Sequence, residues 1–311
     1  MSRQVSVHQA PVEGRGDASP RALQAAARRR ALAPYALLAP TGLFLVIFFM
    51  WPMAQALALA FQDQAGQFNL DSFQHMVADY AFWPAVRNTL LLIVVIVPLQ
   101  LVVALVMALL LQARLRGTQF FLYVWVIPLA ISDLAAGIVW LSIFTDHGYV
   151  NSVLVDLGLS KFGVQFLSYQ HPVYLFFAVV VAEVWRSTSL MLVILLSGLQ
   201  GIPKEYGEAA DVFGATFWQK LRFVTLPLLR PSLQVALVLR TILAFEVFAV
   251  VIALAGFNLP VLAGQAYSWY SSYQNTHIAA TYAVLILVFS GISSLIYLRA
   301  LRVPDAQTGA R

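Results

Sequence analysis

The chain has 311 residues, of which 60% are hydrophobic and only 11% charged, and its formal net charge is +5. A soluble globular domain averages about 25% charged residues, so this composition excludes a soluble enzyme or nucleic-acid-binding domain and predicts an integral membrane protein. Because the chain contains no cysteine, disulfides, thiolate metal sites and redox dithiols are excluded as well.

Residues 1–33 are predicted to form a disordered cytosolic tail, because they are polar and are interrupted by Pro11 and Pro20. The apolar stretch that follows, 34–61, is too long for the apolar part of a cleavable signal peptide. We therefore expect it to be the first membrane-spanning helix and not a removable leader.

Five further segments are long and apolar enough to cross about 30 Å of hydrocarbon. Lipid offers no partners for backbone polar groups, so all six spans are expected to be helices. Pro98 and Pro128 fall inside two of them and are expected to introduce kinks. The six predicted spans are 34–61, 85–112, 120–145, 172–199, 226–255 and 278–301.

The distribution of basic residues predicts that both termini, including a C-terminal tail at 303–311, lie in the cytosol. Of the 19 lysines and arginines, only Arg87 and Lys161 fall on the opposite side, and Arg186 and Arg240 lie inside spans. The outer segments are rich in aromatic residues, which are typical of a membrane-interface belt but would also suit a docking partner or a sugar ring. These outer segments are expected at 62–84, 146–171 and 256–277.

The sequence contains no motif typical of catalysis. It has no GxxxxGK[ST] phosphate loop and no GxSxG nucleophile motif. The five histidines are scattered, without the spacing of metal ligands. A membrane enzyme is therefore the least favoured class of function.

Several polar and aromatic residues fall inside the predicted fourth and fifth spans. An arginine at the middle of a lone span costs about 2.5–3.5 kcal/mol on insertion scales, so such residues normally face a partner or a cavity. They could form buried ion pairs that lock the helices together, or they could line a substrate pathway in which aromatic rings stack on a sugar. The candidate pathway residues are Glu183, Trp185, Arg186, Arg240, Phe245, Glu246 and Phe248.

A charged insert, Ile202–Pro231, separates the fourth and fifth spans and is predicted to be a cytosolic helix–turn–helix. Pro203 suits the first turn of a helix, and Gly214 permits a sharp turn. A second short helix, Thr216–Phe223, is expected to end at Leu226-Pro227. It would place Phe217, Leu221 and Val224 on one face. The insert could be a solvated charged surface or a docking element.

The residue order favours the docking element. The series Glu208-Ala209-Ala210, Gly214-Ala215, Phe223, Leu226-Pro227 and Pro231 resembles the EAA loop of ATP-binding cassette (ABC) importer permeases, in particular the carbohydrate branch of the maltose and glycerol-3-phosphate permeases. Asn88-Thr89-Leu90 and Ile127-Pro128 are also similar, and the resemblance covers about 35–305. The chain departs from the family pattern at Phe213, where an aspartate is usual, and in the outer segment 256–277.

The resemblance implies the type I ABC importer permease fold, an all-α integral membrane protein with six transmembrane helices and a cytosolic coupling helix–turn–helix within 202–226. It implies a second homologous permease as a heterodimer partner, two ATP-binding cassette subunits that bind ATP and Mg, and an extracytoplasmic solute-binding protein. The chain itself would hold no cofactor and would lie in the cytoplasmic (inner) membrane of a prokaryote. The implied ATPase-coupling residues are Glu205, Glu208, Ala209, Ala210, Gly214, Phe217, Leu221, Phe223 and Pro227.

Two alternatives to a carbohydrate importer remain open. A phosphorylated polyol such as glycerol 3-phosphate would suit the two arginines near the middle of the membrane, although Glu183 and Glu246 roughly balance their charge and favour a neutral sugar. An autonomous secondary transporter would be expected to show an internal repeat with broken spans in matching positions, and the sequence shows none.

Overall fold

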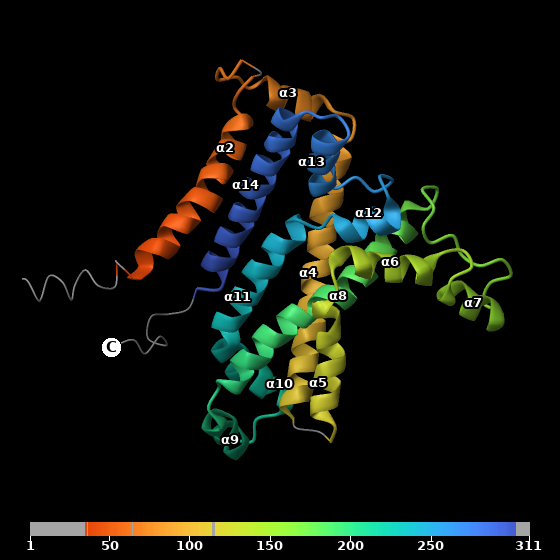
Figure 1. The fold of residues 1–311 in the computed structure, drawn as a ribbon. Helices are drawn as coiled ribbons and strands as arrows, with labels where there is room; N and C mark the ends of the chain where they lie inside the picture. Colours follow the sequence, from red (N-terminus) through yellow and green to blue (C-terminus); the bar gives the residue numbers. More distant parts are fainter. Residues whose placement is uncertain (1–34, 36, 64, 114–115, 303–311) are drawn as a thin grey trace, which may run out of the picture. The chain divides into compact units, whose positions relative to one another are not determined.

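The computed structural model describes residues 35, 37–63, 65–113 and 116–302, so the predicted tails 1–33 and 303–311 lie outside the described residues. Within this part, the regular structure is helical, apart from an isolated β-bridge between Gln62 and Phe68 (Figure 1). Among the described residues, five helices are long and apolar enough to cross a membrane, or six if the bent pair 118–130 and 133–156 counts as one span.

The chain divides into two compact units, Met1–Ala56 and Leu57–Arg311. Most of the first candidate span, Leu37–Leu59, belongs to the first unit; it contains the π-helical turn η1 (Val46–Met50), followed by α2 (Trp51–Leu59). The remaining elements are α3 (Asp71–Ala78), α4 (Phe82–Gln112), α5 (Thr118–Val126), η2 (Ile127–Ala130), α6 (Asp133–Phe144), α7 (Tyr149–Asp156), α8 (Pro172–Gln200), α9 (Lys204–Val212), α10 (Phe217–Lys220), η3 (Leu221–Thr225), α11 (Leu226–Phe245), α12 (Ala249–Ala255), α13 (Leu262–Ser271) and α14 (Thr276–Ala300).

Small residues let the helices of the second unit approach closely. Ala104 and Ala108 of α4 are fully buried in one cluster with leucines of α8 and α11. Gly198 of α8 has no room for a side chain, because an added Cβ would collide with Ser232 of α11. A Cβ on Gly137 of α6 would lie 2.5 Å from that of Ala253 on α12. Such close contacts are the usual basis of helix packing in membranes.

The third predicted span, 120–145, is wrong as a single helix. The chain runs through α5 and the 3-10 turn η2, becomes extended at Ile131 and Ser132, and restarts as α6 after a bend of 105°. Pro128 lies in the 3-10 turn, where its missing N–H cannot sustain an α-helix. Ser132 then caps α6, because its side chain accepts a hydrogen bond from Ala135 N–H at 3.3 Å. By contrast, α4 continues through Pro98.

The fifth predicted span, 226–255, is also divided. α11 ends at Phe245, and α12 begins at Ala249. Between them, Glu246 is exposed, and Phe248 adopts a non-helical backbone conformation while its ring packs 4.8 Å from that of Tyr267. The break allows α12 to pack against α6 and α8 instead of continuing along the axis of α11 (Figure 1).

The predicted outer segments contain further helices: α3 in the first, α7 in the second and α13 in the third. Figure 1 shows α13 at one end of the second unit and α9 and α10 at the opposite end. Helices of the first and third predicted outer segments, α3 and α13, therefore lie at the end opposite the predicted cytosolic insert, whereas α7 lies to the side (Figure 1).

Candidate functional site

The predicted helix–turn–helix begins with α9, which ends in a tight turn at Gly214. Gly214 has a φ of +72°, a left-handed conformation that glycine adopts without strain. The N–H of Gly214 donates to Asp211 O at 2.9 Å, and the N–H of Ala215 donates to Ala210 O at 3.0 Å. This pair of bonds is a Schellman cap, which satisfies the last carbonyls of the helix and fixes the direction of the chain that follows.

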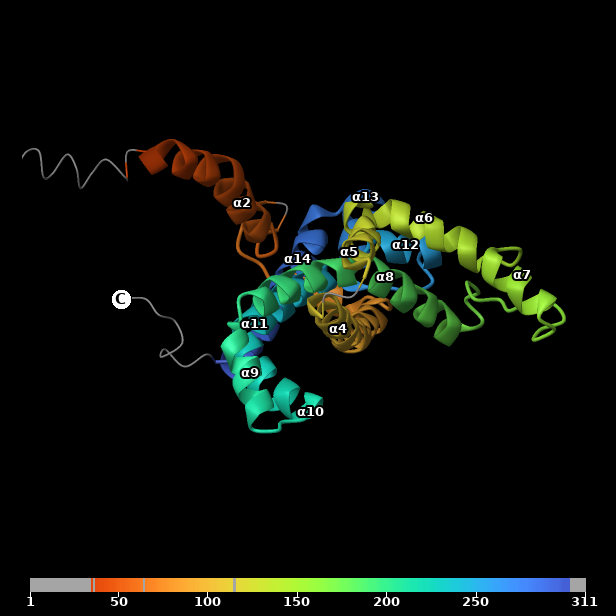
Figure 2. The same cartoon turned by 90° about the horizontal axis from the view of Figure 1, so that it is seen from below.

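Two further contacts order α10: one caps its start, and the other joins it to α9. Thr216 and Gln219 form a reciprocal capping box at the start of α10. Across the turn, Lys220 Nζ lies 2.7 Å from Asp211 Oδ1. The two short helices and the turn at Gly214 are thus held as one element, shown beside the start of α11 in Figure 2.

The predicted end of the second helix at Leu226-Pro227 is wrong. The helical path continues from α10 through the π-helical turn η3 into α11, so that 217–245 forms one candidate span. The N–H of Leu226 donates to Leu221 O, a π-type bond, and Pro227 follows in the first turn of α11. Pro227 has no backbone N–H and so cannot donate an α-helical hydrogen bond. Its position directly after the wider π-helical turn, in the first turn of α11, does not require that bond. The element formed by α9, the turn and α10 is therefore joined directly to a membrane-spanning helix.

The surface of this element is open to solvent. Glu205, Glu208 and Phe217 are exposed, and Phe223 is 69% exposed. A hollow of about 440 Å³ runs between the element and the end of α4. Phe217, Leu221 and Val224, the residues predicted to share one face, line it together with Glu208. Among the remaining predicted coupling residues, Ala209 is exposed, whereas Ala210 and Pro227 are half-buried.

A second candidate site is a network of buried charges between α4, α8 and α11. Arg240 Nη2 donates to Glu183 Oε2 at 2.9 Å, and Arg240 Nε donates to Gln100 Oε1 at 2.6 Å. The Arg240 side chain is 1% exposed and that of Glu183 is 0% exposed. Ser187 Oγ also donates to Glu183 Oε2 at 3.1 Å. Arg240 is thus held by an acid and an amide from two neighbouring helices.

Arg186 extends the network towards α6. Arg186 Nη1 lies 2.7 Å from Asp133 Oδ1, and Arg186 Nε lies 3.7 Å from Glu183 Oε1. The Asp133 side chain is 47% exposed, so this end of the network is far less buried than Arg240. Two arginines and two acids therefore face one another, and their formal charges balance.

Gln100 and Asp133 were missed by the sequence reasoning, although each is a polar residue within or beside a long apolar stretch, which is the signal that would have found them. The predicted role of Glu246 in balancing the arginines is wrong, because Asp133 takes that place. Glu246 is exposed at the end of α11, with no ion pair among the described residues. Its position in the break between two helices explains its exposure.

The predicted aromatic residues lie in different environments. Trp185 is half-buried, with its ring 5.9 Å from that of Trp140 in an edge-to-face arrangement. Phe245 is only 2% exposed and packs in the core near Phe289. Phe248 lies in the break after α11. Of these three rings, only that of Trp185 belongs to the helical turn that carries Glu183 and Arg186.

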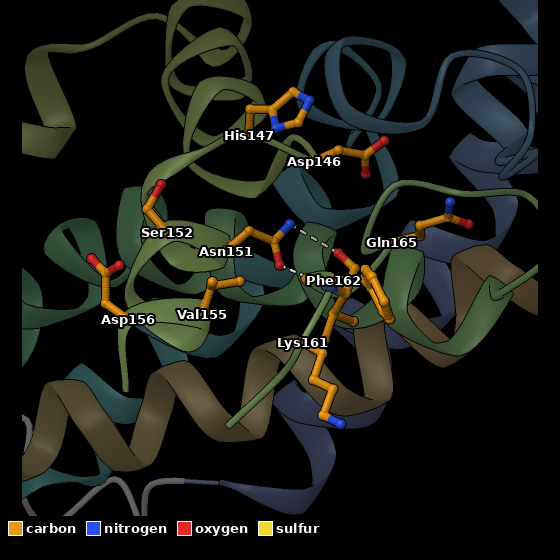
Figure 3. A pocket seen from close by; sticks show the side chains of 11 residues that line it. Asp146, His147, Asn151, Ser152, Val155, Asp156, Lys161, Phe162 and Gln165 are labelled. Atoms are coloured by element: carbon orange, nitrogen blue, oxygen red, sulfur yellow. Dashed lines mark hydrogen bonds between the residues drawn. The ribbon is translucent and has the colours of Figure 1, made fainter. Parts of the chain in front are cut away.

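A separate polar hollow of about 530 Å³ lies in the predicted outer segment around α7 (Figure 3). Asn151, which is 2% exposed, holds its walls together. Asn151 Nδ2 donates to Thr145 O at 3.1 Å and to Val164 O at 2.9 Å, while its Oδ1 accepts from Val164 N–H at 2.7 Å. Because every polar atom of this amide group is bonded, we interpret Asn151 as a structural clamp.

Replacing Asn151 by alanine is expected to loosen this outer segment without unfolding the membrane helices. The change removes three hydrogen bonds, each worth about 1 kcal/mol. Hydrogen–deuterium exchange should therefore become faster across 145–165 and stay unchanged in α8. Asn258→Ala, at an exposed outer position, is the matched control. Unchanged exchange across 145–165 would contradict the role of Asn151 as a clamp.

Comparison with known proteins adds independent information. The family described as "Binding-protein-dependent transport system inner membrane component" matches residues 100–302. The chain is 30% identical over 287 residues to the sulfoquinovosyl glycerol transport system permease protein SmoG of Agrobacterium fabrum, with 86% of this chain and 90% of SmoG covered. It is 36% identical over 188 residues to the trehalose/maltose transport system permease protein MalF of Thermococcus litoralis, with 60% and 62% covered.

A solved structure is also similar. It is a chain of a bacterial ABC transporter involved in the import of the acidic polysaccharide alginate, with a TM-score of 0.75 and 24% identity, and the match covers 91% of this chain and 98% of that chain. At 24% identity, this similarity is evidence for a shared fold and not for a shared function. It confirms the predicted all-helical importer permease fold.

Proposed function

The chain belongs to the family of binding-protein-dependent transport system inner membrane components, and we propose that it is the pore-forming permease subunit of an ATP-driven carbohydrate importer. The observation that carries the proposal is the match to SmoG along nearly all of both chains, together with the match to MalF. The latter is named for trehalose and maltose, which are neutral sugars. A self-sufficient secondary transporter is disfavoured, because the family is described as binding-protein-dependent.

The proposed complex contains a second homologous permease, two ATP-binding cassette subunits and an extracytoplasmic solute-binding protein. The family description supports the solute-binding protein. The lack of a phosphate-loop motif in the sequence supports a requirement for partner subunits that bind ATP and Mg. The complex would lie in the cytoplasmic membrane, with both termini of this chain in the cytosol, as the basic residues predict.

The element formed by α9, the turn at Gly214 and α10 is the proposed contact with the ATPase subunits. Its surface combines the exposed acids Glu205 and Glu208 with apolar side chains that nothing in the described chain covers, since Phe213 is 89% exposed and Trp218 is 74% exposed. Exposed apolar groups of this kind mark interaction surfaces. The continuous helical path from α10 into α11 supports a rigid lever that carries motion of the ATPase subunits into the membrane.

The charge network supports two different roles within the membrane. We assign Arg240 and Glu183 to a structural lock, because both side chains are fully enclosed and bond to each other. We assign Arg186, with the neighbouring Trp185, to contact with the substrate, because the Arg186–Asp133 pair is partly exposed. The balanced charge of the four ionised groups favours a neutral sugar over a phosphorylated polyol.

Replacing Arg186 by alanine is expected to raise the half-saturation concentration for sugar uptake by about tenfold. A hydrogen bond from a charged group contributes about 1.5–3 kcal/mol, and each 1.4 kcal/mol changes the affinity about tenfold. Arg87→Ala, an exposed arginine at the start of α4, is the control. The measurement is the concentration dependence of uptake by reconstituted transporter. Poor assembly of the complex at unchanged half-saturation would instead assign Arg186 to the structural lock.

The proposed function is tested by reconstituting the chain with its partner permease and ATPase subunits in liposomes. Uptake of trehalose or maltose should require ATP and the solute-binding protein and should be inhibited by vanadate. Uptake by the chain alone, without ATPase subunits, would contradict the proposal. A competition panel on the associated solute-binding protein would then identify the sugar.

A further inference from the structure

A small hollow of about 340 Å³ lies at the outer end of the second unit, between the start of α4 and α13. In Figure 1 this is the end opposite α9. Its volume falls in the range typical of small-molecule pockets. No residue of the described chain that lines it carries a charge at neutral pH. The lining residues are Tyr80, Ala81, Pro84, Phe257, Pro260, Gln265, Ser268, Ser272 and Tyr273.

The floor of the hollow provides hydrogen-bonding groups without partners. Gln265 is only 9% exposed, yet its side-chain amide forms no hydrogen bond within the described part of the chain. The amide is not among the fully enclosed polar atoms without a partner, so it is open to the hollow. A ligand that covered it would have to pair with it, because an unpaired buried amide is costly. Ser268 Oγ donates to Gly264 O at 3.0 Å, which leaves the hydroxyl oxygen free to accept. Gln265 and Ser268 of α13 and the C-cap residue Ser272 follow one face at intervals of three and four residues.

The rim of the hollow provides aromatic rings. Tyr80 is 89% exposed, Phe257 is 62% exposed and Tyr273 is 60% exposed. A sugar ring has an apolar face of C–H groups that packs on an aromatic ring, while its hydroxyl groups donate and accept hydrogen bonds at its edge. An amide and hydroxyl groups beside exposed aromatic rings match this combination, with one apolar side and one polar side.

The walls of the hollow are held in place before any ligand arrives. Asp79 accepts from Ala81 N–H through Oδ1 and from Trp269 Nε1 through Oδ2, each at 3.0 Å. This joins the start of α4 to α13, and the Trp269 ring lies 4.7 Å from that of Tyr273. A preorganised site loses less entropy when a ligand binds.

The segment before α13 is fixed by the two polar residues that the sequence analysis noted at the head of α4. Asn88 Nδ2 donates to Pro260 O at 3.0 Å, and Thr89 Oγ1 accepts from Leu262 N–H at 2.9 Å. Both side chains are buried, at 7% and 3% exposure. These hydrogen bonds fix the backbone just before Gln265, and so they help to hold the Gln265 side chain in position beside the hollow.

We propose that this hollow is an outer subsite for a neutral sugar ring, occupied by the substrate before it enters the membrane pathway. The inference rests on the proposed carbohydrate function and adds a location and a charge class to it. A phosphorylated polyol would leave its charge without a cationic partner here. A purely apolar ligand would leave the Gln265 amide unpaired.

The test uses the assembled transporter in detergent, without its solute-binding protein, and measures equilibrium binding of trehalose, maltose and lactose, with glycerol 3-phosphate as the anionic comparison. Wild type is expected to bind at least one of the neutral sugars and not glycerol 3-phosphate. Gln265→Leu and Tyr80→Ala are each expected to weaken that binding about tenfold, which corresponds to the loss of one good contact. Gln170→Leu and Tyr169→Ala, exposed positions in a different outer segment, are the matched controls and should bind as wild type does.

Sugar binding unchanged in both Gln265→Leu and Tyr80→Ala would overturn the subsite while leaving ATP-driven sugar uptake, and hence the proposed function, intact. Weaker association of the solute-binding protein or of the partner permease, with unchanged sugar binding, would also overturn it and would assign the hollow to a protein contact. If reconstituted wild type imports no sugar, the proposed function fails and the subsite fails with it. Thermal unfolding of each variant confirms that the fold is retained.

Discussion

Replacing Arg240 by alanine is expected to lower the free energy of unfolding by about 3–5 kcal/mol, the cost of leaving one member of a buried ion pair without its partner. The Glu183 carboxylate would remain fully enclosed with its main cationic partner gone. The amide of Gln100 would lose its bond to Arg240 Nε as well. Since these residues come from α4, α8 and α11, the loss would affect the packing of all three helices.

The measurement is thermal unfolding of the purified protein in detergent. Arg230→Ala is the matched control, because it removes an exposed arginine from the same helix. The double variant Arg240→Met with Glu183→Leu should recover most of the lost stability, because an apolar pair of similar volume removes both fully enclosed charges and leaves Arg186 paired with Asp133. A raised half-saturation concentration at unchanged stability would instead make Arg240 a substrate contact and would contradict the lock.

The positions of the apolar spans and of the charged insert follow from hydropathy alone, because each signal extends over many residues. The breaks after Pro128 and Phe245 do not follow in this way, because hydropathy continues across both of them. At the first break, the sequence does carry a local signal. Ser132-Asp133 is a typical helix start with a capping side chain followed by an acid, and it stands four residues after a proline. The kink expected at Pro128 marks this break, but the extended residues Ile131 and Ser132 and the new helix start were not predicted.

The partners of the buried charges could not be predicted from the sequence. That Glu183, Arg186 and Arg240 need partners follows from the cost of charge within a membrane. Which partners they find depends on how three helices pack, and sequence spacing specifies only contacts within one helix. A spacing of three residues places Glu183 and Arg186 on one face of α8, whereas Gln100 and Asp133 are brought to the arginines only by the packing of the folded chain.

Replacing Glu208 by arginine is expected to abolish uptake while leaving the protein inserted in the membrane. Glu208 lies on the exposed surface of α9 and lines the hollow beside Phe217 and Leu221, so it contributes little to the fold. If this surface docks to an ATPase subunit, a reversed charge there costs several kcal/mol, which corresponds to a loss of coupled transport of about a hundredfold or more. ATP hydrolysis by the complex should no longer depend on the sugar-loaded binding protein.

The control for Glu208→Arg is Asp156→Arg, the same reversal of charge at an exposed position on α7, which lies well away from α9 and α10 (Figure 1). Both variants should reach the membrane in wild-type amounts, because neither residue is buried. Normal uptake by Glu208→Arg would show that the acid is part of a solvated surface and that coupling runs through another contact. Loss of uptake by Glu208→Arg alone, with ATP hydrolysis continuing, would identify α9 as the element through which ATP hydrolysis drives the membrane helices. The turn at Gly214 and the continuous helix from α10 to α11 can transmit this motion only if the surface of α9 binds the ATPase subunit.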